Sequence, residues 1–280
     1  MNRTLEGKLA IVTGASRGIG EAIARKLASY GANIALCYTS PSSESKTEAL
    51  AKDLEAAHSI KTVVLQADLS TTDGPQALIT ALQIATDGTP QIDILINNAG
   101  VAHNALLPSV NPEQFDISYR TNVLGPLLLT QAAEPWLPHD RSGRIVNISS
   151  VSSATGFIEQ SVYGGTKAAL EAMTRTWARE LSERCTVNAV NPGPVAGPMY
   201  AANTDAFKQE IRGWIEHTPL MRAREGVDDD AVVEEARTAA GGGRPAYVQE
   251  IAGIVAMLCG EDAAWCTGQV VCANGGMIMH

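Results

Sequence analysis

Residues 9–20 decide the fold; they read LAIVTGASRGIG, a short apolar run that ends in a glycine-rich loop. Ile19, Ile23 and Leu27 then recur at helical spacing, so the loop joins a strand to an amphipathic helix. At such a junction Gly14 permits a tight turn. Gly18 lets the backbone approach a pyrophosphate, and Gly20 allows the helix to pack closely on the strand. Since a helix N-terminus offers free N–H groups to phosphates, the stretch predicts a dinucleotide-binding βαβ unit.

The same alternation continues along the chain. The predicted strands are residues 9–12, 34–37, 62–65, 92–96, 144–148, 186–190 and 270–272. The predicted helices include residues 75–86, 112–136, 162–183 and 248–258. Strands that are apolar on both faces and lie between helices indicate a parallel sheet covered on both sides. We therefore expect an α/β protein of one domain over residues 1–280, a Rossmann fold with a doubly wound sheet of about seven strands.

The composition excludes several classes of protein. Of the 280 residues, 45% are hydrophobic, which is enough for a substantial core, and the formal net charge is −9. A negative surface repels phosphates, so we expect no nucleic-acid partner. No apolar stretch approaches the roughly 20 residues of a membrane helix and we find no signal peptide, so we expect a cytoplasmic protein without membrane association. The five cysteines form no Cys-x-x-Cys pair and the five histidines are scattered, which predicts reduced thiols and no metal site.

Tyr163-Gly164-Gly165-Thr166-Lys167 places a phenol and an amine at positions i and i+4 of a predicted helix, on one face. An ammonium favours the phenolate and so lowers the pKa of the tyrosine from its usual value of about 10. Tyr163 could then give a proton to a carbonyl oxygen as a hydride arrives, or take one in reverse. Taken alone, this spacing also fits a solvated pair. Ser150, however, follows a strand whose carboxyl end should lie at the ligand-binding edge of the sheet.

The glycine spacing Gly-x-x-x-Gly-x-Gly, with Ser150 and Tyr163-x-x-x-Lys167, closely resembles the short-chain dehydrogenase/reductase family. The resemblance spans residues 5–276 and extends to NADPH-dependent ketoreductases of the 3-oxoacyl-carrier-protein and polyketide types. It implies that Ser150 bonds the substrate oxygen, Tyr163 is the acid–base group and Lys167 also holds the nicotinamide ribose. It further implies that Asn122 helps to order a water that relays protons. Ser149 is the rival serine, and the family interval favours Ser150.

The resemblance also implies which residues contact the cofactor. Asp68-Leu69 is similar to the family's adenine contact, residues 97–100 to its motif beside adenine and ribose, and residues 191–195 to its loop beside the nicotinamide. The expected cofactor-binding residues are Gly14, Ser16, Arg17, Gly18, Ile19, Gly20, Tyr38, Thr39, Ser40, Asp68, Leu69, Asn98, Ala99, Gly100, Tyr163, Lys167, Pro192, Gly193 and Val195.

The end of the second predicted strand bears on the choice of cofactor. NAD-binding folds of this kind usually carry Asp or Glu there, bonded to the ribose diol. Here no acid appears before Glu44, and residues 38–43 offer hydroxyls and backbone N–H groups that would accept a 2′-phosphate. Arg17 in the glycine loop adds positive charge, although it also fits an ordinary exposed arginine. Together these features favour NADP(H) over NAD(H).

Two features depart from the family pattern. Family members commonly carry a threonine at the position of Gly197, bonded to the nicotinamide carboxamide. Either Tyr200 or a backbone group replaces it here, or the cofactor is held more loosely. The second feature is an acidic insertion at residues 222–244, inside the substrate-loop region 193–247. It is either a solvated surface segment or part of a lid over the substrate.

The substrate-facing segments should be residues 152–160, 194–214 and 277–280. Their apolar and aromatic residues indicate a fairly large apolar or aromatic ketone, although each could instead pack in the core: Phe157, Met199, Tyr200, Phe207 and Trp214. We therefore expect an NADPH-dependent reductase of a polyketide-like carbonyl compound. The alternatives are an NAD(P)-dependent secondary-alcohol dehydrogenase working oxidatively, and a nucleotide-binding scaffold without turnover. By the resemblance we also expect a homotetramer or homodimer that associates through residues 112–136 and 162–183.

Overall fold

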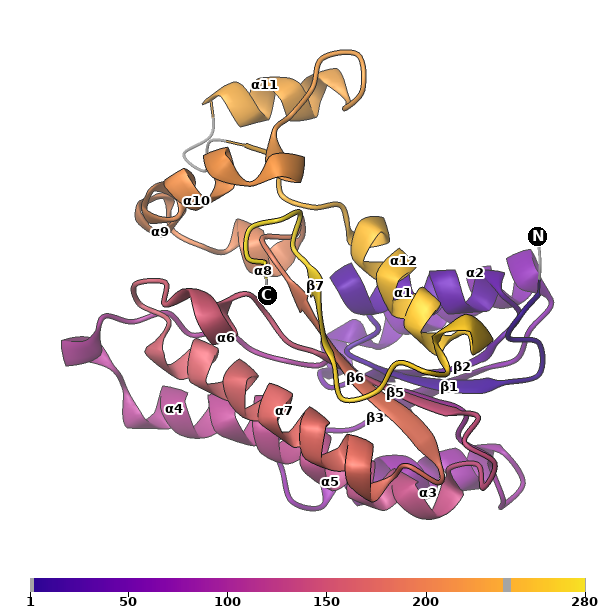
Figure 1. Ribbon diagram of the computed structural model, residues 1–280. Coiled ribbons are helices and arrows are strands. Elements are labelled where there is room, and N and C mark those ends of the chain that lie inside the picture. Colours follow the sequence, from indigo (N-terminus) through magenta and orange to yellow (C-terminus); the bar gives the residue numbers. More distant parts are fainter. Residues whose placement is uncertain (1–2, 239–242, 280) are drawn as a thin grey trace.

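Seven parallel strands form one sheet in the computed structural model, which describes residues 3–238 and 243–279 (Figure 1). The strands are β1 (Leu9–Thr13), β2 (Asn33–Tyr38), β3 (Thr62–Gln66), β4 (Ile94–Asn97), β5 (Gly143–Ile148), β6 (Cys185–Pro192) and β7 (Val270–Ala273). Their order across the sheet is β3-β2-β1-β4-β5-β6-β7. The expected doubly wound sheet is thus confirmed, and each strand begins and ends within two residues of its predicted limits.

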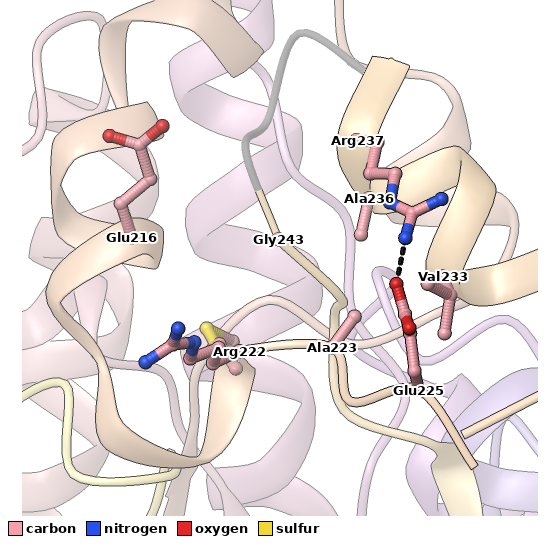
Figure 2. A pocket seen from close by; sticks show the side chains of 9 residues that line it. Glu216, Arg222, Ala223, Glu225, Val233, Ala236, Arg237 and Gly243 are labelled. Carbon is pink, nitrogen blue, oxygen red and sulfur yellow. Dashed lines mark hydrogen bonds and ion pairs between the residues drawn. The ribbon is translucent and has the colours of Figure 1, made fainter. Parts of the chain in front are cut away.

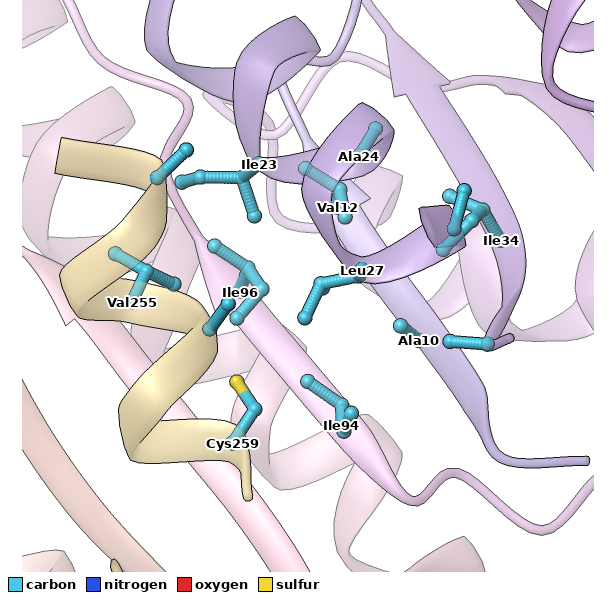
Figure 3. Close-up of a cluster of buried hydrophobic side chains, with 14 of the residues drawn as sticks. Ala10, Val12, Ile23, Ala24, Leu27, Ile34, Ile94, Ile96, Val255 and Cys259 are labelled. Atoms are coloured by element: carbon cyan, nitrogen blue, oxygen red, sulfur yellow. The ribbon is translucent and has the colours of Figure 1, made fainter. Parts of the chain in front are cut away.

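Successive residues of a strand point to opposite faces of the sheet, and both faces are covered. One face packs against α1 (Gly18–Ser29), α2 (Glu44–His58) and α12 (Val248–Cys259). The other packs against α3 (Gly74–Ala85), α5 (Gly125–Ala133) and α7 (Ser161–Glu180). Figure 3 shows the first of these cores, where side chains of α12 and α1 meet those of the central strands. Each large aliphatic side chain buried there contributes about 1.5–3 kcal/mol relative to exposure.

The predicted single helix over residues 112–136 is wrong, because the segment has three helical geometries. It consists of α4 (Pro112–Tyr119), a π-helical stretch (Arg120–Leu124), α5 and a 3-10 turn (Glu134–Trp136). In the π-helical stretch the N–H of Gly125 donates to the carbonyl of Arg120, five residues back. Pro126 has no N–H to offer the carbonyl of Asn122, so the α-helical pattern cannot continue through this point.

Short helices gather over the carboxyl edge of the sheet, where Figure 1 shows α8 to α11. They are α6 (Ser152–Thr155), α8 (Pro198–Ala201), α9 (Asp205–Glu210), α10 (Arg212–His217) and α11 (Asp230–Thr238). The 3-10 turns Pro41–Ser43, Leu107–Ser109, Pro219–Met221 and Glu261–Ala263 complete the described helical segments. Phe207 is buried in a small core of this region, and Phe157 and Tyr200 pack against it. Of the side chains expected to face the substrate, these three therefore contribute to packing.

The insertion at residues 222–244 is anchored by a buried ion cluster. Arg244, only 6% exposed, contacts Asp228 at 3.1 Å and makes two hydrogen bonds of 2.9 Å with Glu250 at the start of α12. Ala246, just beyond the insertion, pairs with Val195. The end of the insertion is thus tied to α12, and the chain directly after it to the loop after β6, while most of its other described residues are exposed. Two of its four glycines, Gly241 and Gly242, lie outside the described residues, as does His280.

Candidate active site

The glycine loop lies at the carboxyl edge of the sheet, directly after β1. On one side of β1 the sheet continues with β2 and β3, and on the other side with β4 to β7, so the strand order reverses here. This switch point is where open α/β sheets bind ligands. Gly14 has a φ of 64°, in the left-handed region, and the N–H of Ala15 donates to the carbonyl of Cys37 at 2.9 Å. A Cβ at Gly20 would lie 2.5 Å from Asn98 Nδ2 and 2.9 Å from the carbonyl carbon of Gly14. The loop can therefore fold this tightly only with glycine at position 20.

The loop fits a dinucleotide. No described side chain caps the N-terminus of α1, and Arg17 at the N-cap is extended and exposed. No described atom lies within 4 Å of the position where Gly18 would carry a Cβ. The first N–H groups of α1 are thus open to an anion, and a pyrophosphate suits both their geometry and the helix dipole.

Asn98 and Thr13 fix the glycine loop through hydrogen bonds. Asn98 Nδ2 donates to the carbonyls of Thr13 (2.7 Å) and Gly14 (3.3 Å). The hydroxyl of Thr13 accepts the N–H groups of Asn98 and Ala99 at 2.9 Å and donates to the carbonyl of Ile96. The side chain of Asn98 therefore acts on the loop itself. Thr13 was not predicted as a functional residue; its position between strand and glycine motif was the available signal.

The other residues expected to bind the cofactor lie along the same edge and differ in their exposure and hydrogen bonds. The carboxylate of Asp68 accepts the N–H and hydroxyl of Ser70, at 2.9 and 2.7 Å, and Leu69 is buried in the core. Thr39 and Ser40 are exposed beyond β2, while Tyr38 is buried. Pro192 is the last residue of β6, and Gly193 and Val195 follow it at this edge. Leu69 can therefore offer a cofactor only its backbone.

The carboxylate of Glu44 lies beside this edge of the sheet. The hydroxyl of Tyr38 is hydrogen-bonded to Glu44, and burial together with this negative charge raises the pKa of Tyr38. The 3-10 turn Pro41–Ser43 returns the chain, so that an acid six residues along the sequence comes back to the end of β2. Residues 38–43 contain no acid, yet the carboxylate of Glu44 lies at the end of β2.

The structure distinguishes the two candidate serines. The hydroxyl of Ser149 donates to Glu171 Oε1 at 2.6 Å. Ser150 is hydrogen-bonded to Tyr163, and its hydroxyl donates to Ser152 Oγ at 3.0 Å. Ser150 and Tyr163 thus share one site, whereas Ser149 is committed to another residue.

Burial controls the charges of the tyrosine and the lysine. It raises the pKa of Tyr163 above the usual value of a phenol, and the hydrogen bond with Ser150 opposes this only in part. The Lys167 Nζ lies 5.7 Å from the ring centre of Tyr163 and donates to the carbonyl of Ile148 at 2.8 Å. Burial lowers the pKa of Lys167 to about 8, and the charge of Glu171 acts in the opposite direction. The expectation that Lys167 lowers the pKa of Tyr163 is not met here, and at neutral pH the phenol is protonated.

Asn122 lies in the π-helical stretch and is completely buried. Its Nδ2 donates to the carbonyl of Val101 (2.8 Å) and to the hydroxyl of Thr166 (3.0 Å), and its Oδ1 accepts the N–H of Val101 at 2.9 Å. The widened helix aims this side chain at the segment after β4 and at α7. Asn122 is therefore fixed between Gly100-Val101 and the helix that carries Tyr163 and Lys167.

Gly164 allows α6 to lie directly on α7. A Cβ at this position would be 2.5 Å from the carbonyl oxygen of Ser152 and 3.4 Å from its carbonyl carbon. Since Ser152 is two residues from Ser150, this close approach brings the serine segment onto the tyrosine helix.

Gly197 has a backbone reason to be glycine. Its φ is 154°, a conformation that side-chain-bearing residues rarely adopt, and it stands at the N-cap of α8. A threonine at this position would be strained. The chain thus carries glycine instead of threonine here because of the backbone conformation with which it enters α8.

Three amide side chains form a hydrogen-bonded row beside the site; we call Gln160, Asn104 and Asn203 the amide row. Gln160 Nε2 donates to Asn104 Oδ1 at 3.3 Å, and Asn104 Nδ2 donates to Asn203 Oδ1 at 3.2 Å. Gln160 is the N-cap of α7, one turn before Tyr163, and its Oε1 is buried with no partner among the described residues. Asn104 was not predicted, because a lone amide in a loop carries no pattern.

A separate hollow of about 350 Å³ lies between α10, α11 and residues 221–225. Figure 2 shows its charged lining, in which Arg237 pairs with Glu225. None of Asn122, Ser150, Tyr163 and Lys167 lines it. In the described part of the chain no cluster of three metal-ligand side chains occurs, and no helix there is long and apolar enough to cross a bilayer.

The chain is similar to known reductases over its whole length. The model of the short chain dehydrogenase family matches residues 8–207. An L-xylulose reductase from Aspergillus niger is 53% identical, and the match covers 99% of each chain. An L-xylo-3-hexulose reductase from Hypocrea jecorina is 48% identical over 100% of this chain and 99% of that protein. The crystal structure of a blue fluorescent protein from a metagenomic library, in complex with NADPH, is 32% identical with a TM-score of 0.83, over 99% of this chain and 100% of that one.

Proposed function

Since this chain belongs to the short-chain dehydrogenase family, and is therefore an oxidoreductase acting on CH–OH and C=O groups, we propose that it reduces a short polyhydroxy ketone with NADPH. The observation that carries the proposal is the 53% identity to an L-xylulose reductase over 99% of both chains. The earlier expectation of a large apolar, polyketide-like substrate is not supported, because the two relatives above are named for sugar ketones.

The site supports proton transfer in the direction of reduction. NADPH, when bound, supplies the hydride to the carbonyl carbon. Tyr163 is protonated at neutral pH and can give its proton to the carbonyl oxygen, while Ser150 donates a hydrogen bond to the same oxygen. The same groups serve the oxidation of a secondary alcohol, and the ratio of the two cofactor forms sets the direction.

The amide row supports a hydroxylated substrate. Gln160, Asn104 and Asn203 keep unused donors and acceptors after bonding to one another. Vicinal hydroxyls need both kinds of partner, whereas an apolar ketone would leave the buried Gln160 Oε1 unpaired at a cost of about 1–3 kcal/mol.

The direct test is an NADPH-consumption screen. It compares L-xylulose and other ketopentoses and ketohexoses with aliphatic and aromatic ketones that carry no further hydroxyls. The proposal predicts the highest kcat/KM with a polyhydroxy ketone. A screen in which aromatic ketones are reduced best would refute it.

Arg17→Ala is expected to raise KM for NADPH by about 10-fold and to change KM for NADH little, because an arginine–phosphate hydrogen bond contributes about 1.5–3 kcal/mol. Kinetics with both cofactors and one ketone measure the effect. Arg25 on the same helix pairs with Glu21 and Asp53, so Arg25→Ala is the matched control and should leave both KM values unchanged. Equal changes in the two KM values for Arg17→Ala would contradict the proposed preference for NADPH.

Gln160→Leu is expected to raise KM for L-xylulose by about 5- to 10-fold, because each lost hydrogen bond costs about 0.5–1.5 kcal/mol. Kinetics on a ketone without further hydroxyls provide the comparison and should change little. If both substrates lose affinity equally, Gln160 supports the fold of the loop rather than recognising hydroxyls.

The pH dependence should reveal the buried lysine. The pKa of Lys167 is lowered to about 8, so its ammonium is present below that pH and is lost above it. We expect kcat/KM for NADPH, which reports on the free enzyme, to fall as pH rises through about 8. Lys167→Arg keeps its charge at alkaline pH and should lack this decline, whatever its maximal rate. A decline that persists in Lys167→Arg belongs to another group.

We further propose that the enzyme is a cytoplasmic homo-oligomer. The cysteines in the described part of the chain are free, which fits a reducing compartment. Phe115 and Ile117 on α4 and Leu127 on α5 are exposed, within the segment expected to form the contact surface. Sedimentation equilibrium measures the oligomeric state directly.

A further inference from the structure

Glu171 holds the two serines that flank Ser150. Its Oε1 accepts the hydroxyl of Ser149 at 2.6 Å and that of Ser153 at 2.7 Å. Ser149 directly follows β5, and Ser153 belongs to α6, whereas Glu171 lies on α7, one turn beyond Lys167. One carboxylate oxygen therefore ties the segment that carries Ser150 to the helix that carries Tyr163 and Lys167.

The two contacts are strong ones. Hydrogen bonds from a hydroxyl to a carboxylate are short, and they are about twice as strong as those between neutral groups. Ser149 is only 3% exposed, so an apolar residue in place of Glu171 would leave its buried hydroxyl with only the carbonyl of Lys167, 3.4 Å away, as an acceptor. The segment is also fixed at Gly164, where α6 and α7 touch. Glu171 and Gly164 thus hold α6 on α7 at two points, by a polar contact and by a van der Waals contact.

We propose that Glu171 is a positioning residue, which fixes the hydroxyl of Ser150 against that of Tyr163 by binding the serines on either side of it. It touches neither the substrate site nor the reacting groups directly. The role does not depend on which ketone the enzyme reduces, because it concerns the Ser150–Tyr163 pair alone.

The electrostatics of the helix agree with this role. The hydrogen bond between Ser150 and Tyr163 lowers the pKa of Tyr163, against the effect of burial. The charge of Glu171 raises the pKa of Lys167, also against the effect of burial. Loss of the Glu171 contacts would therefore free Ser150 to move and leave the phenol of Tyr163 harder to ionise.

Two substitutions separate the hydrogen bonds from the rest of the side chain. The amide oxygen of Glu171→Gln still accepts both hydroxyls, and Glu171→Leu accepts neither. At pH 6.5, below the pKa of Lys167 of about 8, we expect Glu171→Gln to stay within about 3-fold of the wild-type kcat. We expect Glu171→Leu to lose about 10- to 100-fold in kcat with KM for NADPH unchanged, because small misplacements at a reacting centre have effects of that size. Glu180→Leu, on the exposed end of the same helix, is the matched control and should behave as wild type.

Two further measurements do not rely on one activity assay. Tyrosinate absorbance of the cofactor-free protein, minus that of Tyr163→Phe, gives the titration of Tyr163; this titration should move to higher pH in Glu171→Leu and stay in place in Glu171→Gln. The pair Ser149→Ala with Ser153→Ala should reproduce the kcat loss. Adding Glu171→Leu to that pair should cost nothing more, because all three act through the same contacts.

The proposal is overturned if Glu171→Leu keeps the wild-type kcat and Tyr163 titration, or if its effect adds to that of the two serine substitutions. If Glu171→Leu does not fold, the serine pair carries the same test: an unchanged kcat and an unchanged Tyr163 titration would overturn the proposal.

Discussion

Tyr163→Phe is expected to lower kcat by about 10³-fold, because general acid catalysis by one positioned group contributes about 10²–10⁴-fold. Such a loss corresponds to about 4 kcal/mol in the activation free energy. The variant keeps the half-buried ring and removes only the hydroxyl that bonds to Ser150. Stopped-flow reduction of L-xylulose, or of the best ketone from the screen, gives kcat for the chemical step.

The binding of NADPH, followed by its fluorescence, is the control for Tyr163→Phe. The hydroxyl of Tyr163 lies beside Ser150, whereas the glycine loop that fits the pyrophosphate lies between β1 and α1. The dissociation constant should therefore stay within about 3-fold of the wild-type value, the effect of one modest hydrogen bond. A variant that keeps most of its kcat would remove Tyr163 from the acid–base role.

Gly20→Ala is expected to abolish measurable NADPH binding and to lower the free energy of unfolding by about 3 kcal/mol, at the upper end of typical overpacking effects. The new Cβ would lie 2.5 Å from Asn98 Nδ2 and would overlap the carbonyl of Gly14. Neither Asn98 nor Gly14 can move away from the new Cβ, because Asn98 Nδ2 is hydrogen-bonded to the carbonyls of Thr13 and Gly14. NADPH fluorescence titration and thermal unfolding, each with and without cofactor, measure the two effects.

Gly213→Ala provides the comparison for Gly20→Ala. Gly213 lies in α10, its φ is not positive, and no described atom lies within 4 Å of its would-be Cβ. Alanine there should stabilise the protein by about 0.5–1 kcal/mol through helix propensity. If both alanines are tolerated alike, the glycine loop has more room than the geometry allows.

The sheet and the cofactor loop could be predicted because their signals are local. A strand buried on both faces is a short apolar run, and a phosphate loop needs glycines at fixed offsets from it. Seven such runs therefore located seven strands. Ser150, Tyr163 and Lys167 were also predicted, through the family resemblance, and the structure brings them together at the end of β5.

What the sequence did not disclose depends on contacts between distant segments. The π-helical stretch around Asn122 follows from Pro126. The prediction of one long helix over residues 112–136 did not take the missing N–H of this proline into account. Glu44 returns to Tyr38 through a 3-10 turn, so its distance along the chain was misleading. The pKa of Tyr163 was assigned the wrong direction, because spacing shows the nearby amine but not the extent of burial.

Gly164 also has a bearing on efforts to widen the range of ketones that this enzyme accepts. Libraries that randomise the residues next to Tyr163 would include position 164, yet even a methyl group there meets the backbone of Ser152. Most members of such a library would separate α6 from α7 and would be inactive whatever ketone they were offered. Substitutions at residues 104, 160 and 203, the proposed contacts of the substrate hydroxyls, would leave Gly164 unchanged and so keep α6 on α7.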